Sequence, residues 1–286
     1  MTDLERYGPL SWAGPSWLAD HLDEVRLIDA QPHLHDYLKG HVPGAVFCEE
    51  IPLRVTANGL PGQMISEAMA AQLFSRLGVD AQRPVVIYTG KGKVKGWGDG
   101  ISQFLWAYAL LRFGHRNVIL LDGGLERWEA EGHDLTQAID RIQATAFSAI
   151  SVRGMTASLE EVKASLRDQE AMVIDTRAPQ VYSGQSSWSA PGHIPGAVNI
   201  PWRLLMREGH LTWMRPKAEM EEVFAVRGAL DRSHLIVSCG TGREAACEYL
   251  ILKYILGRSV RLHEGSFTEW VAAGLPAVTG ESAGSY

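Results

Sequence analysis

Short apolar segments alternate along this chain with longer segments in which apolar residues recur at helical spacing. Residues 84–88 and 235–238 are nearly uniformly apolar and rich in β-branched side chains, which predicts strands covered on both faces of a parallel sheet. Residues 66–77 and 243–256 have helical periodicity and are each followed by a glycine, which predicts helices. This alternation indicates an α/β fold with mainly parallel sheets flanked by helices.

The same pattern occurs twice. Gly40-His-Val-Pro-Gly-Ala-Val46 recurs as Gly192-His-Ile-Pro-Gly-Ala-Val198, at an offset of 192 − 40 = 152 residues. Each copy follows an apolar strand that ends in Ile-Asp, and further matched segments follow in the same order. A duplicated domain explains this order better than chance similarity. His41 and His193 open the two turns, so we expect them to be turn residues rather than catalysts.

The length of 286 residues is about right for two domains. We predict one domain over residues 1–140 and a second over residues 156–286, joined by a polar linker at 141–155. Ser158 and Glu161 have the spacing of a capping box, which predicts a helix that starts there and runs to about residue 167.

Charge and composition narrow the function classes. The net charge of −6 argues against a nucleic-acid surface, and the longest apolar stretch, residues 101–111, is far below the roughly 20 residues that span a membrane. No secretory leader is recognisable. Three cysteines do not make a disulfide framework and favour a reducing compartment, so we expect a cytoplasmic protein. The histidines show no metal-ligand spacing with the cysteines, so neither a metal nor another cofactor is expected.

The candidate chemistry lies at Cys239, which directly follows a predicted buried strand. In an open α/β sheet, ligands bind beyond the carboxyl ends of the strands. Gly240 and Gly242 allow the following loop to curl, so we expect the backbone N–H groups of residues 240–244 to surround an anion. Such a site should lower the pKa of the Cys239 thiol and hold a persulfide, whose outer sulfur is also anionic.

Free cysteines are more often small buried packing residues. The strand, the cysteine, the loop glycines and the helix occur together only at Cys239, which favours function there. Cys48 and Cys247 lack this setting, and we expect them to be packing residues. Cysteine phosphatases with a similar loop need an arginine after five intervening residues; that position is Ala245 here.

At these residues the sequence resembles the rhodanese family in its two-domain form. The resemblance rests on both GH[VI]PGAV segments, on the Cys239-Gly-Thr-Gly loop, and on Glu264-Gly-Ser-Phe-Thr-Glu-Trp270; it covers about residues 15–278. It implies two rhodanese-like domains, an active cleft between them, and a catalytic cysteine in the second domain alone. Thr89 stands at the matching position of the first copy.

The resemblance also implies a sulfurtransferase. Cys239 would take a sulfane sulfur from a small anionic donor, thiosulfate or 3-mercaptopyruvate, and pass it to cyanide, a thiol or a protein thiophile. Thr241 matches the loop hydroxyl of the mercaptopyruvate enzymes. Arg243 brings a positive charge expected to help bind the donor, whereas Glu244 places a carboxylate that opposes an anionic sulfur.

Other positions depart from the family pattern. The family's substrate-binding arginine falls on Val181, which leaves the donor open, and Arg177 is expected to be a structural ion-pair partner. Asp29, Asp36 and His41 are the candidates for a first-domain group that assists the cysteine. Two alternatives stay open: a persulfide carrier or regulatory module that serves a protein partner, and a cysteine phosphatase or arsenate reductase-like enzyme.

Overall fold

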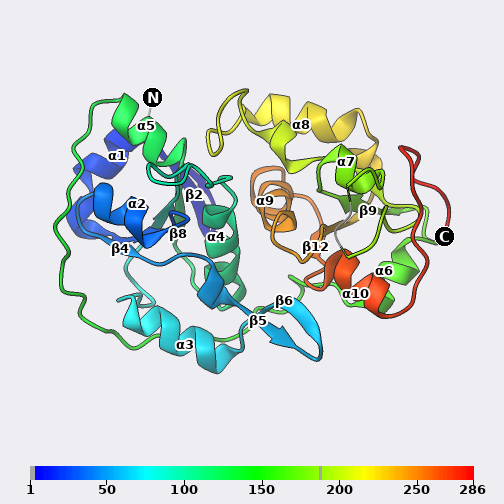
Figure 1. Ribbon diagram of the computed structural model, residues 1–286, viewed down its shortest axis with the longest axis horizontal. Coiled ribbons are helices and arrows are strands. Elements are labelled where there is room, and N and C mark those ends of the chain that lie inside the picture. The colour runs from blue at the N-terminus through cyan, green and yellow to red at the C-terminus, as the bar shows by residue number, and fades with distance from the viewer. Residues whose placement is uncertain (1–3, 187–188) are drawn as a thin grey trace. The chain divides into compact units, whose positions relative to one another are not determined.

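The computed structural model of the chain describes residues 4–186 and 189–286 (Figure 1). Within that part of the chain, the backbone forms two compact units. The first comprises the described part of Met1–Leu53 with Ile65–Val152 and Met206–Met214; the second comprises Arg54–Met64, the described part of Arg153–Leu205, and Arg215–Tyr286. Each unit therefore includes a short segment from the other half of the sequence, so neither unit is a single continuous stretch of the chain.

The first unit is built on a sheet with the strand order β1-β2-β8-β7-β3-β4. β1 and β2 are antiparallel, and the other neighbours pair in parallel. The strands are β1 (Leu4–Tyr7), β2 (Leu10–Ala13), β3 (Arg26–Asp29), β4 (Ala45–Phe47), β7 (Val85–Tyr88) and β8 (Val118–Leu121). The helices are α1 (Pro15–Asp20), α2 (Leu34–Lys39), α3 (Glu67–Arg76), α4 (Ser102–Arg112) and α5 (Gly124–Ala130), with short 3₁₀ turns at Leu22–Glu24 and Ile51–Leu53.

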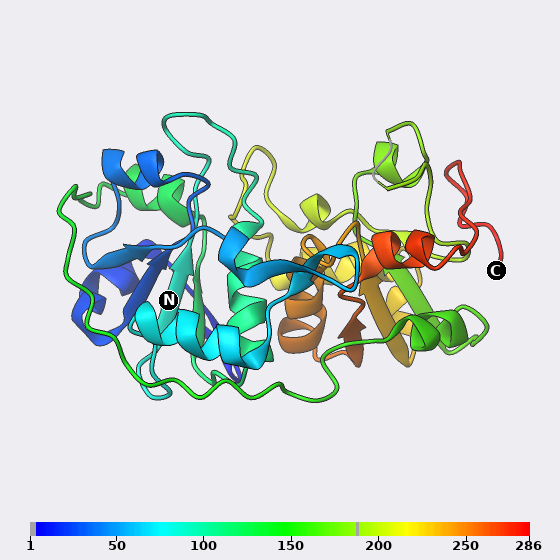
Figure 2. The ribbon, with the colours of Figure 1, turned by 60° about the horizontal axis from the view of Figure 1, so that its bottom comes forward.

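The second unit has a parallel sheet with the order β10-β9-β11-β12. Its strands are β9 (Ala171–Asp175), β10 (Val198–Asn199), β11 (His234–Ser238) and β12 (Val260–Leu262). Its helices are α6 (Leu159–Ser165), α7 (Pro179–Tyr182), α8 (Lys217–Ala225), α9 (Ala245–Leu250) and α10 (Ser266–Ala272), with 3₁₀ turns at Trp202–Leu205 and Ala229–Asp231. The antiparallel hairpin of β5 (Arg54–Ala57) and β6 (Leu60–Met64) also belongs to this unit and contacts α10 (Figure 2).

Both sheets are covered on both faces, which explains why their strands are apolar at nearly every position. In the second unit, Val173 and Ile236 pack with α6 and α10 on one face. Their neighbours in the strands face the other way, where α9 contacts β11 and β12. Leu235 and Val237 are almost fully buried there. The prediction of mainly parallel α/β domains is confirmed.

The repeated glycine-histidine turn has the same structure in both units. The His41 ring stacks on Tyr37 with 3.6 Å between ring centroids, and the His193 ring stacks on Tyr182 at 3.5 Å. In each case Nδ1 of the histidine lies 2.8 Å from the carbonyl oxygen of the same tyrosine. These contacts confirm that both histidines support the turn.

Predicted helix ends agree with the structure in two places and differ in a third. Ser66 Oγ accepts the Met69 N–H ahead of α3, and Ser158 forms the predicted capping box with Glu161 at α6. The helix predicted over residues 243–256 begins later, at Ala245, and continues beyond α9 as a π-helix over Ile251–Ile255. Among the described residues, no helix combines the length and apolar character needed to cross a membrane.

Candidate active site at Cys239

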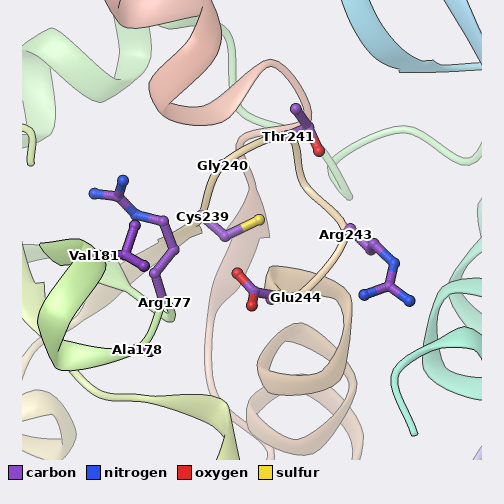
Figure 3. A pocket seen from close by; sticks show the side chains of 8 residues that line it. All are labelled: Arg177, Ala178, Val181, Cys239, Gly240, Thr241, Arg243 and Glu244. Carbon is purple, nitrogen blue, oxygen red and sulfur yellow. The ribbon is translucent and has the colours of Figure 1, made fainter. Parts of the chain in front are cut away.

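Cys239 directly follows β11 and lines a pocket of the second unit with a volume of about 280 Å³ (Figure 3). The thiol is buried, with 1% of the residue exposed. Four of the predicted loop residues line the same pocket, namely Gly240, Thr241, Arg243 and Glu244. The rest of the wall comes from the segment after β9, with Arg177, Ala178 and Val181. The structure therefore brings the cysteine and its loop together at a cavity.

Gly242 has a different role from the lining residues. Its φ angle is +78°, and a Cβ atom there would lie 2.8 Å from the carbonyl oxygen of Glu264. A side chain at this position would be strained and would also clash with the backbone. The curl of the loop therefore requires glycine at position 242.

The sulfur of Cys239 points into the curl of the loop, toward the side of Glu244 (Figure 3). Hydrogen bonds from the backbone amides of Thr241 and Ala245 lower the pKa of the thiol. Ala245 lies one residue beyond the predicted ring of amides at residues 240–244. The Thr241 amide belongs to the predicted ring and the Ala245 amide does not, and a contribution from the other amides of residues 240–244 stays a prediction.

The prediction of a lowered thiol pKa is wrong for the free cysteine. Burial raises the pKa of the Cys239 thiol, the negative charge of Glu244 raises it further, and together they outweigh the two amides. Removing a thiolate from water disfavours the charged form, and a nearby carboxylate does the same. The complete burial of the sulfur could not be inferred from the loop sequence.

Arg54, in the β5–β6 hairpin, was missed by the sequence analysis. Its Nη2 donates hydrogen bonds to the carbonyl oxygens of Thr241 and Gly62, both at 2.7 Å. The positive charge of Arg54 lowers the pKa of the Cys239 thiol. The residue is separated from Thr241 by 187 positions along the chain, and no local pattern marks it.

Arg177 has the structural role that the sequence predicts. Its Nε lies 2.9 and 3.0 Å from the carboxylate oxygens of Asp175, and its Nη2 donates to the carbonyl oxygen of Gly192 at 3.0 Å. The guanidinium also lies 4.5 Å from the ring centre of Phe267. Figure 3 shows it extending away from the sulfur, beside Val181.

Arg243 lines the pocket, but its guanidinium points away from the sulfur on the other side of the loop (Figure 3). In this arrangement it adds positive charge to the rim of the site and does not contact the thiol. Its expected contribution to donor binding stays a prediction.

In the first unit, Thr89 occupies the place of Cys239. The Leu125 N–H donates to the Thr89 carbonyl oxygen at 2.9 Å, just as the Phe267 N–H donates to that of Cys239 at 3.0 Å. The Thr89 hydroxyl donates to the carbonyl oxygen of Ala30 at 2.7 Å. The matched hydrogen bonds confirm the repeat alignment, and the hydroxyl cannot form a persulfide.

The first-unit candidates for assisting groups have partners within their own unit. Asp29 is fully buried and accepts hydrogen bonds from the Gln31 amide and the Tyr88 hydroxyl, and Asp36 accepts one from the Val94 N–H at 2.6 Å. His41 supports its turn. These contacts account for the position of each group in its own unit, and an assisting role at the cysteine stays a prediction.

The remaining cysteines are packing residues, as predicted. Cys48 and Cys247 are buried, and burial raises the pKa of Cys48 to about 12 and that of Cys247 well above its ordinary value.

Comparison with known proteins identifies the family. The model of the rhodanese-like domain matches residues 14–131 and 158–273, one copy in each half. The chain belongs to the rhodanese-like family. It is a two-domain sulfurtransferase of that family, as the sequence resemblance implies.

Relatives and solved structures agree with this assignment over nearly the whole chain. The 3-mercaptopyruvate sulfurtransferase of Escherichia coli K12 is 31% identical, covering 93% of this chain and 96% of that protein. A thiosulfate sulfurtransferase of Corynebacterium glutamicum is 29% identical, covering 93% of this chain and 90% of the relative. The crystal structure of SseA, a 3-mercaptopyruvate sulfotransferase from Escherichia coli, is similar with a TM-score of 0.78 at 29% identity, covering 90% of this chain and 98% of SseA.

Proposed function

We propose that this rhodanese-like protein carries sulfane sulfur on Cys239 as a persulfide. The observation that carries the proposal is the placement of the thiol: it lies at the end of β11, in a pocket, with the amides of Thr241 and Ala245 directed at the sulfur. A thiolate or a persulfide held there would have its negative charge stabilised by N–H groups that are already in position.

The transfer has two displacement steps. The Cys239 thiol first gives up its proton, and the thiolate attacks the outer sulfur of thiosulfate or the thiol sulfur of 3-mercaptopyruvate. A new S–S bond forms while the S–S bond of thiosulfate, or the C–S bond of 3-mercaptopyruvate, breaks. With thiosulfate the leaving group is sulfite, and with 3-mercaptopyruvate it is the enolate of pyruvate, which then takes up a proton. An acceptor nucleophile attacks the outer sulfur in the second step, and Cys239 leaves as the thiolate.

The raised pKa of the free thiol has a consequence for the first step. Most of the empty enzyme holds a protonated Cys239 at neutral pH, so loading should accelerate as the pH rises toward the thiol pKa. Arg54 opposes the effect of Glu244 and increases the thiolate fraction.

The donors proposed are thiosulfate and 3-mercaptopyruvate, and the acceptors are cyanide, a thiol or a protein thiophile. Val181 leaves the pocket wall beside Arg177 apolar, which favours a small donor that is bound chiefly through the loop. Free, buried cysteines suit a reducing compartment, which supports the proposal of a cytoplasmic location.

Mass spectrometry of the intact protein tests the proposal. After incubation with thiosulfate, and separately with 3-mercaptopyruvate, we expect a gain of about one sulfur atom with at least one donor. Cys239→Ser should gain none, whereas the matched control Cys247→Ser should gain as much as the wild type. An undiminished gain in Cys239→Ser would reject this nucleophile.

A further inference from the structure

The hydroxyl group of Ser266 ties both ends of the Cys239 loop to one point. Ser266 is the first residue of α10 and is fully buried. Its Oγ accepts hydrogen bonds from the N–H groups of Cys239 and Gly242, both at 3.0 Å, and donates one to the carbonyl oxygen of His263 at 2.7 Å. The arc from residue 239 to residue 242 is therefore closed across a single oxygen atom.

The residue that carries this hydroxyl has a disfavoured backbone conformation. Ser266 has a φ angle of +51°, and among the described residues the other non-glycine with a positive φ is Asn58. The left-handed region is unfavourable for residues with a Cβ atom, and asparagine tolerates it better than serine does. Strain of this kind persists where the surrounding structure imposes the conformation, and it is concentrated at functional sites.

The first unit shows the same turn without the hydroxyl. Gly124 occupies the matching position with a φ angle of +57°, directly before Leu125, whose N–H donates to Thr89 as that of Phe267 does to Cys239. A Cβ atom on Gly124 would lie 2.4 Å from the Thr89 carbonyl oxygen. The left-handed turn thus belongs to the common scaffold, whereas the serine accompanies the cysteine.

We propose that Ser266 is a positioning residue for sulfur transfer, whose hydroxyl holds the loop so that the amides of Thr241 and Ala245 face the sulfur. The proposal rests on the function proposed above for Cys239. Without Oγ, the buried N–H groups of Cys239 and Gly242 would lose their acceptor, and a buried unpaired donor is unfavourable. The loop would then open so that these N–H groups reach water, and the amides of Thr241 and Ala245 would no longer point at the sulfur.

Two variants separate the hydroxyl from the strain. Ser266→Gly removes both, whereas Ser266→Ala removes the hydroxyl and keeps the Cβ atom in the left-handed region. We expect Ser266→Ala to melt a few degrees below Ser266→Gly, at about 2–4 °C for each kcal/mol of strain. In both variants, sulfur loading from thiosulfate should slow by about tenfold or more, as for the loss of a positioned donor.

Alkylation of the unloaded thiol gives a readout that general destabilisation would not move. The rate of iodoacetamide labelling at Cys239, followed against pH by peptide mass spectrometry, has its midpoint at the thiol pKa. We expect the midpoint to rise by about half a unit or more in both variants, because fewer amides stabilise the thiolate. Asn58→Gly relieves an exposed positive φ and serves as the control, with the midpoint and loading rate of the wild type.

The outcomes distinguish the two proposals. A midpoint and a loading rate that stay at wild-type values in both variants would overturn the role of Ser266, and so would a midpoint that falls. If the wild type gains no sulfur from any donor while the midpoint still rises in the variants, the proposed function fails and the positioning of the thiol by Ser266 stands.

Discussion

The loops after β7 and β11 lie at equivalent places in the two units, yet only one of them holds a thiol. The backbone hydrogen bonds are the same: the Leu125 N–H reaches Thr89, and the Phe267 N–H reaches Cys239. The histidine-tyrosine turns are also the same. The two copies therefore share a backbone scaffold, and the proposed chemistry depends on side chains that differ between them.

The buried aspartate at the end of the matching strands shows a second difference. In the first unit, Gln31 and Tyr88 donate to Asp29; burial raises the pKa of Asp29 to about 6, although these hydrogen bonds lower it. In the second unit, Arg177 supplies a full positive charge to Asp175. The second unit thus keeps an ion pair beside its pocket where the first uses neutral partners.

The largest expected effect comes from moving the thiol between the units. Cys239→Ser should lower the rate of sulfur transfer by about a thousandfold or more, since no other nucleophile replaces it. Adding Thr89→Cys to that variant should not restore transfer, because position 124 lacks the serine hydroxyl that holds the loop of the second unit. Turnover with thiosulfate and cyanide measures both effects. Recovery of activity in the double variant would show that the scaffold alone suffices.

The next effect tests the buried ion pair. Arg177→Met leaves the carboxylate of Asp175 without its cation and should lower the free energy of unfolding by about 3–5 kcal/mol. Arg177→Gln introduces the residue of the first unit, whose amide can still donate, and should cost roughly half as much. Urea unfolding followed by tryptophan fluorescence measures the two losses. Equal losses would mean that the neutral partner gives no compensation in the second unit.

Features that repeat or follow local rules could be predicted from the sequence. The two domains, the parallel strands, the capping box at Ser158 and the position of Cys239 all rest on periodicity or on short motifs. Duplication helped most, because it separated the turn histidines, present in both copies, from the cysteine, present in one.

Features that depend on burial and on distant contacts could not be predicted. The direction of the Cys239 pKa depends on how completely the sulfur is removed from water, which the loop glycines do not reveal. Arg54 reaches the loop because its hairpin belongs to the second unit, although it lies in the first half of the sequence. The proposed role of Ser266 depends on its φ angle and on the buried hydrogen bonds of its hydroxyl, which no sequence pattern shows.

A smaller effect is expected from the cation that the second unit takes from the first half of the chain. Arg54→Met removes the hydrogen bond to the Thr241 carbonyl oxygen and the charge that lowers the thiol pKa. Loading at neutral pH should slow by roughly fivefold, since each unit of upward pKa shift costs about tenfold in thiolate. At saturating thiosulfate, where donor binding no longer limits the rate, Arg243→Met is the matched control for loss of a positive charge, because its guanidinium points away from the sulfur. A deficit of Arg243→Met that is confined to low thiosulfate would assign Arg243 to donor binding, and equal deficits of the two variants at saturating thiosulfate would contradict the role of Arg54.

The smallest effect is an acceleration. Glu244 contributes to the raised pKa of Cys239, second to burial, so Glu244→Gln should lower that pKa while burial keeps it above the ordinary value. Below the thiol pKa the thiolate fraction then increases, and loading at neutral pH should be about threefold faster. Above the pKa both proteins are fully ionised, and their rates should converge. A pH profile of thiosulfate loading therefore decides the cause: a gain that persists unchanged at high pH would assign the carboxylate to repulsion of the anionic donor instead of to the ionisation of the thiol.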